Sequence, residues 1–307
     1  MKKSGKQLIL AICILLFFVG SVPAADWPQY RYDSNRSAAS LEDLPFALHL
    51  QWISEYPQLS PAWPGEPRQQ FDGHYEPVVM GNLLFFGSSL NDSVTALDTE
   101  TGEEKWRFYT NGPVRFAPIA RKEKVYFGSD DGYLYCVNST NGKLIWKVKG
   151  CPSKRKVIGH ERLISCWPVS GGPALVDNTI YFAAGIWAFE GVFIYGLDTE
   201  TGDIVWQADG MDFQYVKNSR GGEAAFRGAT PQGYLVVTED QVIVPCGRGA
   251  PACYDRKTGR FLYRHSSADK SNGGGPYISA GKGLFFCAGG IFESTSGEIV
   301  EFRGRFT

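Results

Sequence analysis

The sequence predicts an all-β protein, a β-propeller built from four-stranded antiparallel blades. Three observations predict this fold: a turn motif recurs at fixed spacing, short apolar runs precede each copy, and glycine and aromatic residues are abundant. The 307-residue chain contains 36 glycines and 14% aromatic residues, and few segments show helical periodicity. Many short strands with glycine-rich turns are typical of sandwiches, barrels and propellers, and a fixed repeat favours the propeller.

The turn motif consists of an Asp or Asn, a Gly four residues later, and an aromatic residue four residues after the Gly. Four copies keep this spacing: Asp98 to Trp106, Asn138 to Trp146, Asp198 to Trp206 and Asp255 to Tyr263. Asp and Asn side chains hydrogen-bond the backbone two residues on, and Gly supplies the positive φ that closes such a turn. Each copy therefore predicts a hairpin that ends one blade.

Apolar runs ahead of each turn supply the other strands of a blade. Examples are Leu84–Gly87, Val125–Gly128, Ile180–Ala183, Val242–Pro245 and Leu284–Cys287. Each unit then holds about four strands, as a propeller blade does. A fifth copy of the motif is degenerate, because Gly297 is retained but Glu301 stands where the aromatic residue is expected.

The motif resembles the tryptophan-docking repeat of PQQ-type (pyrroloquinoline-quinone) propellers, found in quinoprotein dehydrogenases and in outer-membrane assembly lipoproteins. The resemblance covers about residues 75–307, and Trp27–Arg31 also resembles the start of secreted members. It implies a structural role, packing between neighbouring blades, for the aromatic residues Trp106, Trp146, Trp206 and Tyr263. It also implies seven or eight blades. A small five-bladed ring and a truncated piece of a longer ring therefore both stay open.

Three segments are expected along the chain. Residues 1–25 resemble a cleavable signal peptide, with Lys2, Lys3 and Lys6 ahead of the apolar stretch Leu8–Gly20. Residues 26–74 form an N-terminal segment, in which His49–Ile53 is expected to be a strand that closes the last blade. Residues 75–307 form the propeller. This organisation predicts a periplasmic or extracellular protein that meets the membrane only through the uncleaved signal.

Six cysteines follow the signal segment, and an oxidising compartment permits disulfides among them. Cys246 and Cys253 flank a short loop, and Cys151 and Cys166 bracket an irregular segment, so these two pairs are the candidates. The other two, Cys136 and Cys287, lie in strand-like runs and are expected to be buried apolar residues.

Charge and spacing narrow the search for a site. The net charge is −1, from 31 basic and 32 acidic residues, which argues against nucleic-acid binding. The interval from Trp146 to Trp206 is 60 residues and the next is 57, against 40 from Trp106 to Trp146. Two insertions follow, at about 149–172 and 209–229; the first is basic, and long loops often carry function. The expected channel-facing groups are His74, Glu76, Arg115, Trp167 and Arg227.

The family resemblance implies that a dehydrogenase would hold PQQ beside a calcium or lanthanide ion, beneath a disulfide of two adjacent cysteines. No adjacent cysteine pair and no haem-attachment motif occurs in this sequence, and no metal site or catalytic residue is predicted. The favoured function is a non-catalytic binding or scaffolding module in the periplasm, with a protein or small molecule at the propeller face. A PQQ-dependent oxidoreductase, or a degenerate relative of one, and an outer-membrane assembly factor are the alternatives.

Overall fold

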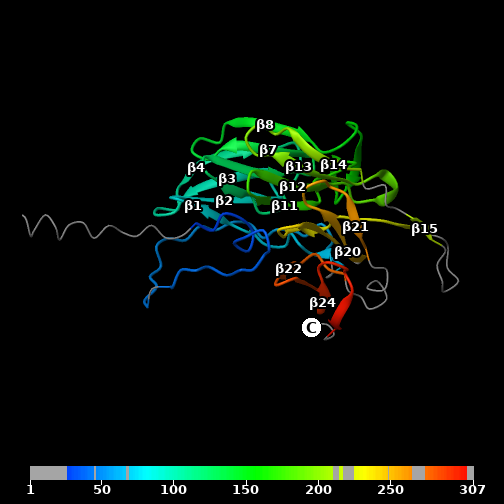
Figure 1. Cartoon of the computed structure of the whole chain (residues 1–307). Coiled ribbons are helices and arrows are strands. Elements are labelled where there is room, and N and C mark those ends of the chain that lie inside the picture. The colour runs from blue at the N-terminus through cyan, green and yellow to red at the C-terminus, as the bar shows by residue number, and fades with distance from the viewer. Residues whose placement is uncertain are drawn as a thin grey trace, which may run out of the picture.

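Five antiparallel sheets, here called blades 1 to 5, follow one another along the chain and fan around a common axis (Figure 1). The computed structural model describes residues 26–44, 46–66, 69–209, 214–216, 225–247, 249–264 and 274–302. The expected signal peptide, residues 1–25, lies outside this range. The predicted propeller of four-stranded blades is confirmed in the part of the chain that is described.

Each blade contains four strands hydrogen-bonded in chain order, and in blade 3 the short strand β17 (Gly233–Tyr234) adds in parallel beside β11. Blade 1 comprises β1 (Val78–Met80), β2 (Leu83–Ser88), β3 (Ser93–Asp98) and β4 (Glu104–Tyr109), and blade 2 comprises β5 (Ile119–Arg121), β6 (Lys124–Gly128), β7 (Tyr133–Asn138) and β8 (Leu144–Lys149). Blade 3 comprises β11 (Gly171–Val176), β12 (Thr179–Ala184), β13 (Phe193–Asp198) and β14 (Ile204–Ala208). Blade 4 comprises β18 (Val236–Val237), β19 (Gln241–Cys246), β20 (Gly249–Asp255) and β21 (Phe261–Tyr263), and blade 5 comprises β22 (Ile278–Gly281), β23 (Leu284–Cys287), β24 (Gly290–Glu293) and β25 (Ile299–Phe302). The first strands of successive blades contact one another, so these strands line the axis.

The repeat turns have the geometry that the sequence predicts. In blade 1, Asp98 Oδ1 accepts hydrogen bonds from the backbone amides of Glu100 and Thr101, both at 3.0 Å. Gly102 has a φ of 73°, which only glycine adopts without strain. The strand register places Trp106 opposite Ala96 and, at the same point of blade 5, Glu301 opposite Ile291. Glu301 therefore occupies the aromatic position of a blade that is otherwise complete.

The aromatic residue of each outermost strand contacts the repeat turn of the next blade. Trp106 Nε1 donates to the Ser139 carbonyl at 2.7 Å, and Trp206 Nε1 donates to the Arg256 carbonyl at 2.8 Å. In the same way, the Tyr263 hydroxyl donates to the Ser294 carbonyl. A Cβ on Gly142 would lie 2.7 Å from the Trp106 ring, so glycine lets the ring lie flat on the turn.

Trp146 makes the same ring contact with a different polar partner. Its ring lies against Gly202, where an added Cβ would come within 2.9 Å. The carbonyl of Thr199, equivalent to that of Ser139, instead accepts the Tyr126 hydroxyl at 3.2 Å, and Trp146 Nε1 has no partner among the described residues. Ring packing on the turn glycine is therefore common to the three tryptophans, and the indole hydrogen bond is not.

Residues 49–53 differ from the expected closing strand. They form no strand in the structure. Trp52 instead donates from Nε1 to the Thr99 carbonyl at 2.9 Å, and its ring covers Gly102. The N-terminal segment therefore places an aromatic residue on the first repeat turn, as the outermost strands of the blades do on the later turns.

The first residues of the N-terminal segment bind all five blades in turn. Trp27 and Val79 exchange two backbone hydrogen bonds of 2.9 Å in blade 1, and Ala120 in blade 2 donates to the Pro28 carbonyl at 2.8 Å. The Gln29 side chain accepts from the Leu175 amide and donates to its carbonyl in blade 3. In blade 4 the amide of Val237 donates to the Ser34 carbonyl, and in blade 5 the amide of Ala280 donates to the Asn35 carbonyl, both at 2.9 Å. All five partners occupy the same register position of an axial strand.

A column of stacked rings fills the axis beside this segment. The rings of Phe71 and Phe116 are parallel with centroids 4.8 Å apart, and Phe116 meets Tyr234 edge-on at 5.1 Å. Tyr234 in turn stacks on Tyr30 at 3.6 Å. A Cβ on Gly172 would come within 2.6 Å of Phe116, so this glycine makes room for the column. The axis is therefore packed with side chains at this depth.

The Arg36 side chain lies at the end of the column formed by Tyr30 and Tyr234. It is 1% exposed, and its guanidinium lies over the Tyr30 and Tyr234 rings at 5.9 and 5.8 Å. It donates to the carbonyls of Leu235 at 3.0 Å and Pro173 at 2.8 Å, and to that of Tyr30 at 3.0 Å. Burial lowers the Arg36 pKa to about 10, so the group keeps its charge at neutral pH. Arg36 thus joins the N-terminal segment to blades 3 and 4.

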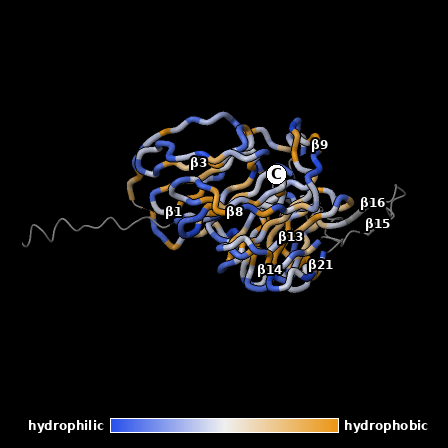
Figure 2. The backbone as a smooth tube through the Cα atoms, turned by 90° about the horizontal axis from the view of Figure 1, so that it is seen from above, coloured by the Kyte–Doolittle hydropathy of each residue, from blue (hydrophilic) through white to orange (hydrophobic). Residues whose placement is uncertain are grey.

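Further apolar clusters lie between successive blades, at the blade 2–3, 3–4 and 4–5 boundaries. Figure 2 shows hydrophobic stretches along the strands and hydrophilic stretches at the turns near β14 and β21. Within the part of the chain that the structure describes, no helix has the length and hydropathy of a membrane span.

We predict that Arg36→Ala lowers the free energy of unfolding by about 3–5 kcal/mol, because it leaves several buried carbonyls without a donor and opens a cavity. Arg31→Ala is the matched control: Arg31 is exposed and lies over the same Tyr30 ring at 5.8 Å. Its loss should cost less than about 1 kcal/mol. Urea denaturation of both variants measures the difference, and equal losses would contradict the assigned role.

Candidate functional site

The first insertion forms a two-stranded hairpin that ties together the loops of three blades. Its strands are β9 (Lys156–Gly159) and β10 (Arg162–Ser165). Arg162 forms an ion pair with Asp92 of blade 1, and the Ser165 amide donates to the Asp130 carbonyl of blade 2 at 2.8 Å. Arg155, just before β9, forms an ion pair with Glu190 of blade 3. These contacts hold the hairpin over the β2–β3, β6–β7 and β12–β13 loops, and the side of the propeller that carries these loops is here called the loop face.

The tip of the hairpin is an unusual two-residue turn. His160 has a φ of 51° and Glu161 a φ of 62°, where such turns ordinarily carry Asn and Gly. The His160 ring meets Trp63 edge-on at 4.8 Å, and Trp63 meets Trp187 at 6.3 Å. Trp187 flanks the short 3-10 helix η2 (Ala188–Glu190). The turn, Trp63 and the η2 loop therefore form one continuous cover.

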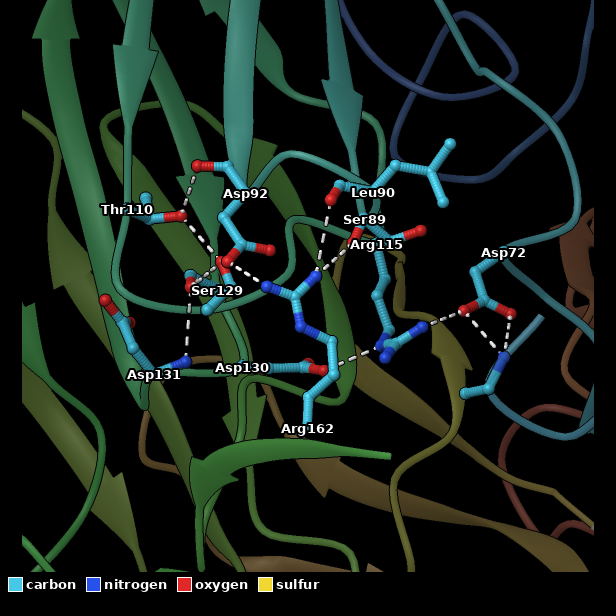
Figure 3. A network of polar contacts seen from close by, with 12 residues as sticks. Asp72, Ser89, Leu90, Asp92, Thr110, Arg115, Ser129, Asp130, Asp131 and Arg162 are labelled. Atoms are coloured by element: carbon cyan, nitrogen blue, oxygen red, sulfur yellow. Dashed lines mark hydrogen bonds and ion pairs between the residues drawn. The ribbon is translucent and has the colours of Figure 1, made fainter. Parts of the chain in front are cut away.

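Arg115 and two carboxylates form the charged centre beneath this cover (Figure 3). Arg115 immediately precedes Phe116 of the ring column, and its side chain is 6% exposed. Its NH1 donates to Asp72 and its Nε donates to Asp130, both at 2.6 Å. Asp72 also accepts the Ala62 amide, at 3.0 Å for the nearer oxygen. The N-terminal segment, blade 2 and the inserted hairpin all meet at this centre.

Burial sets the ionisation of this centre. It raises the pKa of the Asp130 carboxyl to about 6, although the Arg115 guanidinium opposes the shift. Burial tends to lower the pKa of Arg115, but the two carboxylates outweigh it and the pKa of Arg115 is raised. Burial and the nearby Arg115 charge lower the pKa of His160. At neutral pH the centre is an ion-paired triad beneath a neutral imidazole.

The residues predicted to face the channel occupy several environments. Arg115 lies in the charged centre, and Trp167 is buried at the base of the hairpin, where its Nε1 donates to the Glu190 carbonyl at 2.8 Å. Glu76 is half-buried beside the ring column, and burial raises its pKa against the influence of His74. His74 is exposed. Arg227 lies in β16 (Ala225–Arg227), which pairs with β15 (Gln214–Val216), and its side chain is outside the described part.

Neither candidate disulfide is formed. All six cysteines are buried free thiols. Cys253 pairs with Ile243 across the sheet, whereas Cys246 pairs with Gly249, so the strand register keeps these two apart. Cys151 and Cys166 share a buried cluster with Trp167, but the Cys166 sulfur accepts a hydrogen bond from Arg155 at 2.9 Å. The Cys151 thiol donates to the Ser153 carbonyl at 3.2 Å.

Several residues of the site carry no distinct signal in the sequence. Asp130 aligns with an ordinary hairpin turn of the preceding blade, and it does lie in such a turn, between β6 and β7. Asp72 and Trp63 lie in a segment without repeats. Only the fold brings them within reach of Arg115 and His160. The excess of cations in the first insertion was the one usable signal, and Arg155 and Arg162 belong to it.

The residues in the described part of the chain do not form a PQQ and metal site. No group of three His, Cys, Asp or Glu side chains in the described ranges is placed to hold a metal ion. The carboxylates of Asp72 and Asp130 both form ion pairs with Arg115. A cavity of about 610 Å³ beside blade 5 is lined by Arg31 and Tyr277 but by no carboxylate.

The fold and the site define a class: a repeat β-propeller whose blades are joined by aromatic residues on Asp–Gly turns. A family model described as outer membrane protein assembly factor BamB matches residues 50–166. A dehydrogenase subunit of the quinone alcohol dehydrogenase of Gluconobacter oxydans is 27% identical over 143 residues, which is 43% of this chain and 18% of that protein.

Two solved structures have the same fold. A europium-containing methanol dehydrogenase has a TM-score of 0.61 at 14% identity, over 90% of this chain and 57% of that one. BamB from Moraxella catarrhalis has a TM-score of 0.53 at 18% identity, over 74% of this chain and 62% of that one. The chain thus spans little more than half the length of the dehydrogenase structure, and its match covers under a fifth of the curated subunit. These matches support repeats of the PQQ type in this chain.

We predict that Asp130→Asn changes the pH profile of stability between about pH 4 and pH 6. Because the folded pKa of Asp130, about 6, lies above its ordinary value of 3.8, the folded state binds the proton more tightly. The stabilisation is full below the ordinary pKa and is lost as the pH rises through the folded pKa. Relative to the variant, the wild-type chain should therefore lose unfolding free energy across this window.

Asp255→Asn serves as the control of opposite sign. Hydrogen bonds from Thr258 lower the pKa of this exposed turn carboxylate, so its stabilisation is present above the ordinary pKa and is lost on acidification. Chemical denaturation at a series of pH values gives both profiles. A wild-type profile parallel to that of Asp130→Asn between pH 4 and pH 6 would contradict the assignment.

Proposed function

We propose that this chain is a non-catalytic binding and scaffolding propeller of the periplasm, which holds a protein partner on its loop face. The partner surface consists of the β9–β10 hairpin and the η2 loop. The observation that carries the proposal is the exposed apolar side chains on these two neighbouring elements. Ile158 is 84% exposed and Leu163 58%, while Phe189 of η2 is 57% exposed. Apolar groups gathered in this way favour a protein interface.

The rigidity of this surface supports the proposal. Arg155 joins the hairpin to Glu190 of η2, and its guanidinium lies 5.3 Å from the centre of the Trp167 ring. Trp63 contacts both His160 and Trp187. A surface that is already ordered loses little conformational entropy when a partner binds.

The comparisons support a partner-binding role in a limited way. The matching family model is described as an assembly factor of the outer membrane, and a protein of that description acts on other proteins. The dehydrogenase relatives favour the alternative, a PQQ-dependent oxidoreductase. We favour the scaffold because Arg115 neutralises Asp72 and Asp130, and no group of metal-ligating side chains gathers among the described residues.

A photo-crosslinking amino acid at position 158 should form a specific adduct with the partner when the chain is expressed in its native host. Val205 on β14 is the control position, because it is 57% exposed but lies on an outermost strand away from the hairpin. The two positions should differ at least severalfold in adduct yield. Equal yields, or an adduct at position 205 alone, would remove the support for this surface.

The oxidoreductase alternative is tested with the purified mature chain, PQQ, calcium and a redox dye. We expect neither calcium-dependent PQQ binding nor alcohol-dependent dye reduction. Tight binding that calcium chelation reverses, together with substrate-dependent turnover, would overturn the non-catalytic proposal.

A further inference from the structure

The inserted hairpin borders a half-open cavity whose lining does not include Ile158, Leu163 or Phe189 of the proposed partner surface. Its volume is about 250 Å³, and it lies between the end of β8, the start of β9 and the turns of blades 1 and 2. Lys149, Lys154 and Lys156 line it together with Ser153 and Ser165. Asp131 is the one carboxylate in its lining.

The charges in this cavity do not balance. Asp131 is already engaged: its carboxylate accepts the Tyr135 hydroxyl at 2.5 Å and the amides of Asn111 at 3.2 Å and Tyr133 at 3.1 Å. None of the three ammonium groups forms an ion pair or hydrogen bond with any residue in the described ranges. Arg155 also lines the cavity, and its charge is offset by Glu190.

Other lysines of the chain are placed differently. Lys105 pairs with Asp98 at 3.2 Å, and Lys124 pairs with Glu200 at 2.5 Å. Three cations that pair with no described residue repel one another around one hollow. Their arrangement is favourable only when a negative charge lies among them.

The remaining lining groups favour a hydrogen-bond acceptor as the ligand. The Ser153 oxygen accepts the Arg155 amide at 3.2 Å, so its proton remains available to donate. The Tyr133 hydroxyl has no partner within the described ranges. Burial raises the pKa of the Cys151 thiol, so this group stays protonated and is not a nucleophile. The lining suits binding and not covalent chemistry.

The size of the cavity limits the ligand further. At about 30 Å³ for each water molecule, the space corresponds to roughly eight waters. Pockets for drug-sized molecules begin at about 300 Å³. A folded partner or an extended acidic peptide would contact only the rim.

We propose that this cavity binds a small, multiply charged oxoanion of the phosphate or sulfate type, held by Lys149, Lys154 and Lys156. The proposal does not rest on the partner surface, although Lys156 and Ile158 are two residues apart on β9 and therefore share a face of the hairpin. Binding would also stabilise the hairpin against the blades, because the ligand joins β8 to β9.

Inorganic phosphate is the probe. Its effect on thermal unfolding is compared with that of sodium chloride at equal ionic strength, and calorimetry gives the affinity. The double variant Lys154→Gln with Lys156→Gln should lose roughly tenfold or more in affinity, whereas Lys143→Gln with Lys257→Gln should bind as the wild type does. Lys143 and Lys257 are exposed lysines of the repeat turns, so the control removes the same charge elsewhere.

Three outcomes would overturn the proposal: no phosphate effect beyond that of chloride, equal losses in both double variants, or binding of polyglutamate without binding of phosphate. The last result would indicate an acidic macromolecular partner. Crosslinking from position 158 in the Lys154→Gln, Lys156→Gln variant separates the two proposals. Retained crosslinking with lost phosphate binding shows that the partner surface does not depend on the anion site.

Discussion

The hydrogen bonds between the N-terminal segment and the five axial strands are the constraint on which the rest of the structure depends. Each axial strand presents one backbone amide at the same register position, and residues 27–35 satisfy those amides in chain order. A propeller blade contacts only its neighbours, so repeat packing alone leaves the angle between distant blades weakly fixed. A segment that binds all five sets their arrangement directly, and the buried Arg36 anchors it.

The charged centre inherits its geometry from this arrangement. Arg115 follows directly from the ring column through Phe116, and Asp72 follows Phe71 of the same column. The two residues can meet at 2.6 Å because their neighbours stack in parallel. The hairpin then rests on this centre through Ser165 and Asp130. The loop face is thus positioned from the axis outward, which explains how an insertion of irregular sequence becomes an ordered surface.

Local patterns in the sequence predicted the blades, because an Asp–Gly turn and an apolar run determine a hairpin without help from distant residues. The degenerate fifth copy was also placed correctly, with Glu301 at the aromatic position. The contacts of Trp52, Asp72 and Arg36 were not predictable in this way. Each connects segments far apart in the chain, as between Arg36 and Leu235, and no local pattern encodes such a pairing. The segment 49–53 forms no strand, and its contact with blade 1 is made by Trp52.

Hydrogen exchange at five backbone amides tests the central role of the N-terminal segment most directly. The amides are those of Val79, Ala120, Leu175, Val237 and Ala280. If the segment fixes the blades, all five should exchange only through global unfolding, with one shared opening free energy and the full denaturant dependence. Exchange at these amides through local opening, with little denaturant dependence while the strand amides stay protected, would contradict the account.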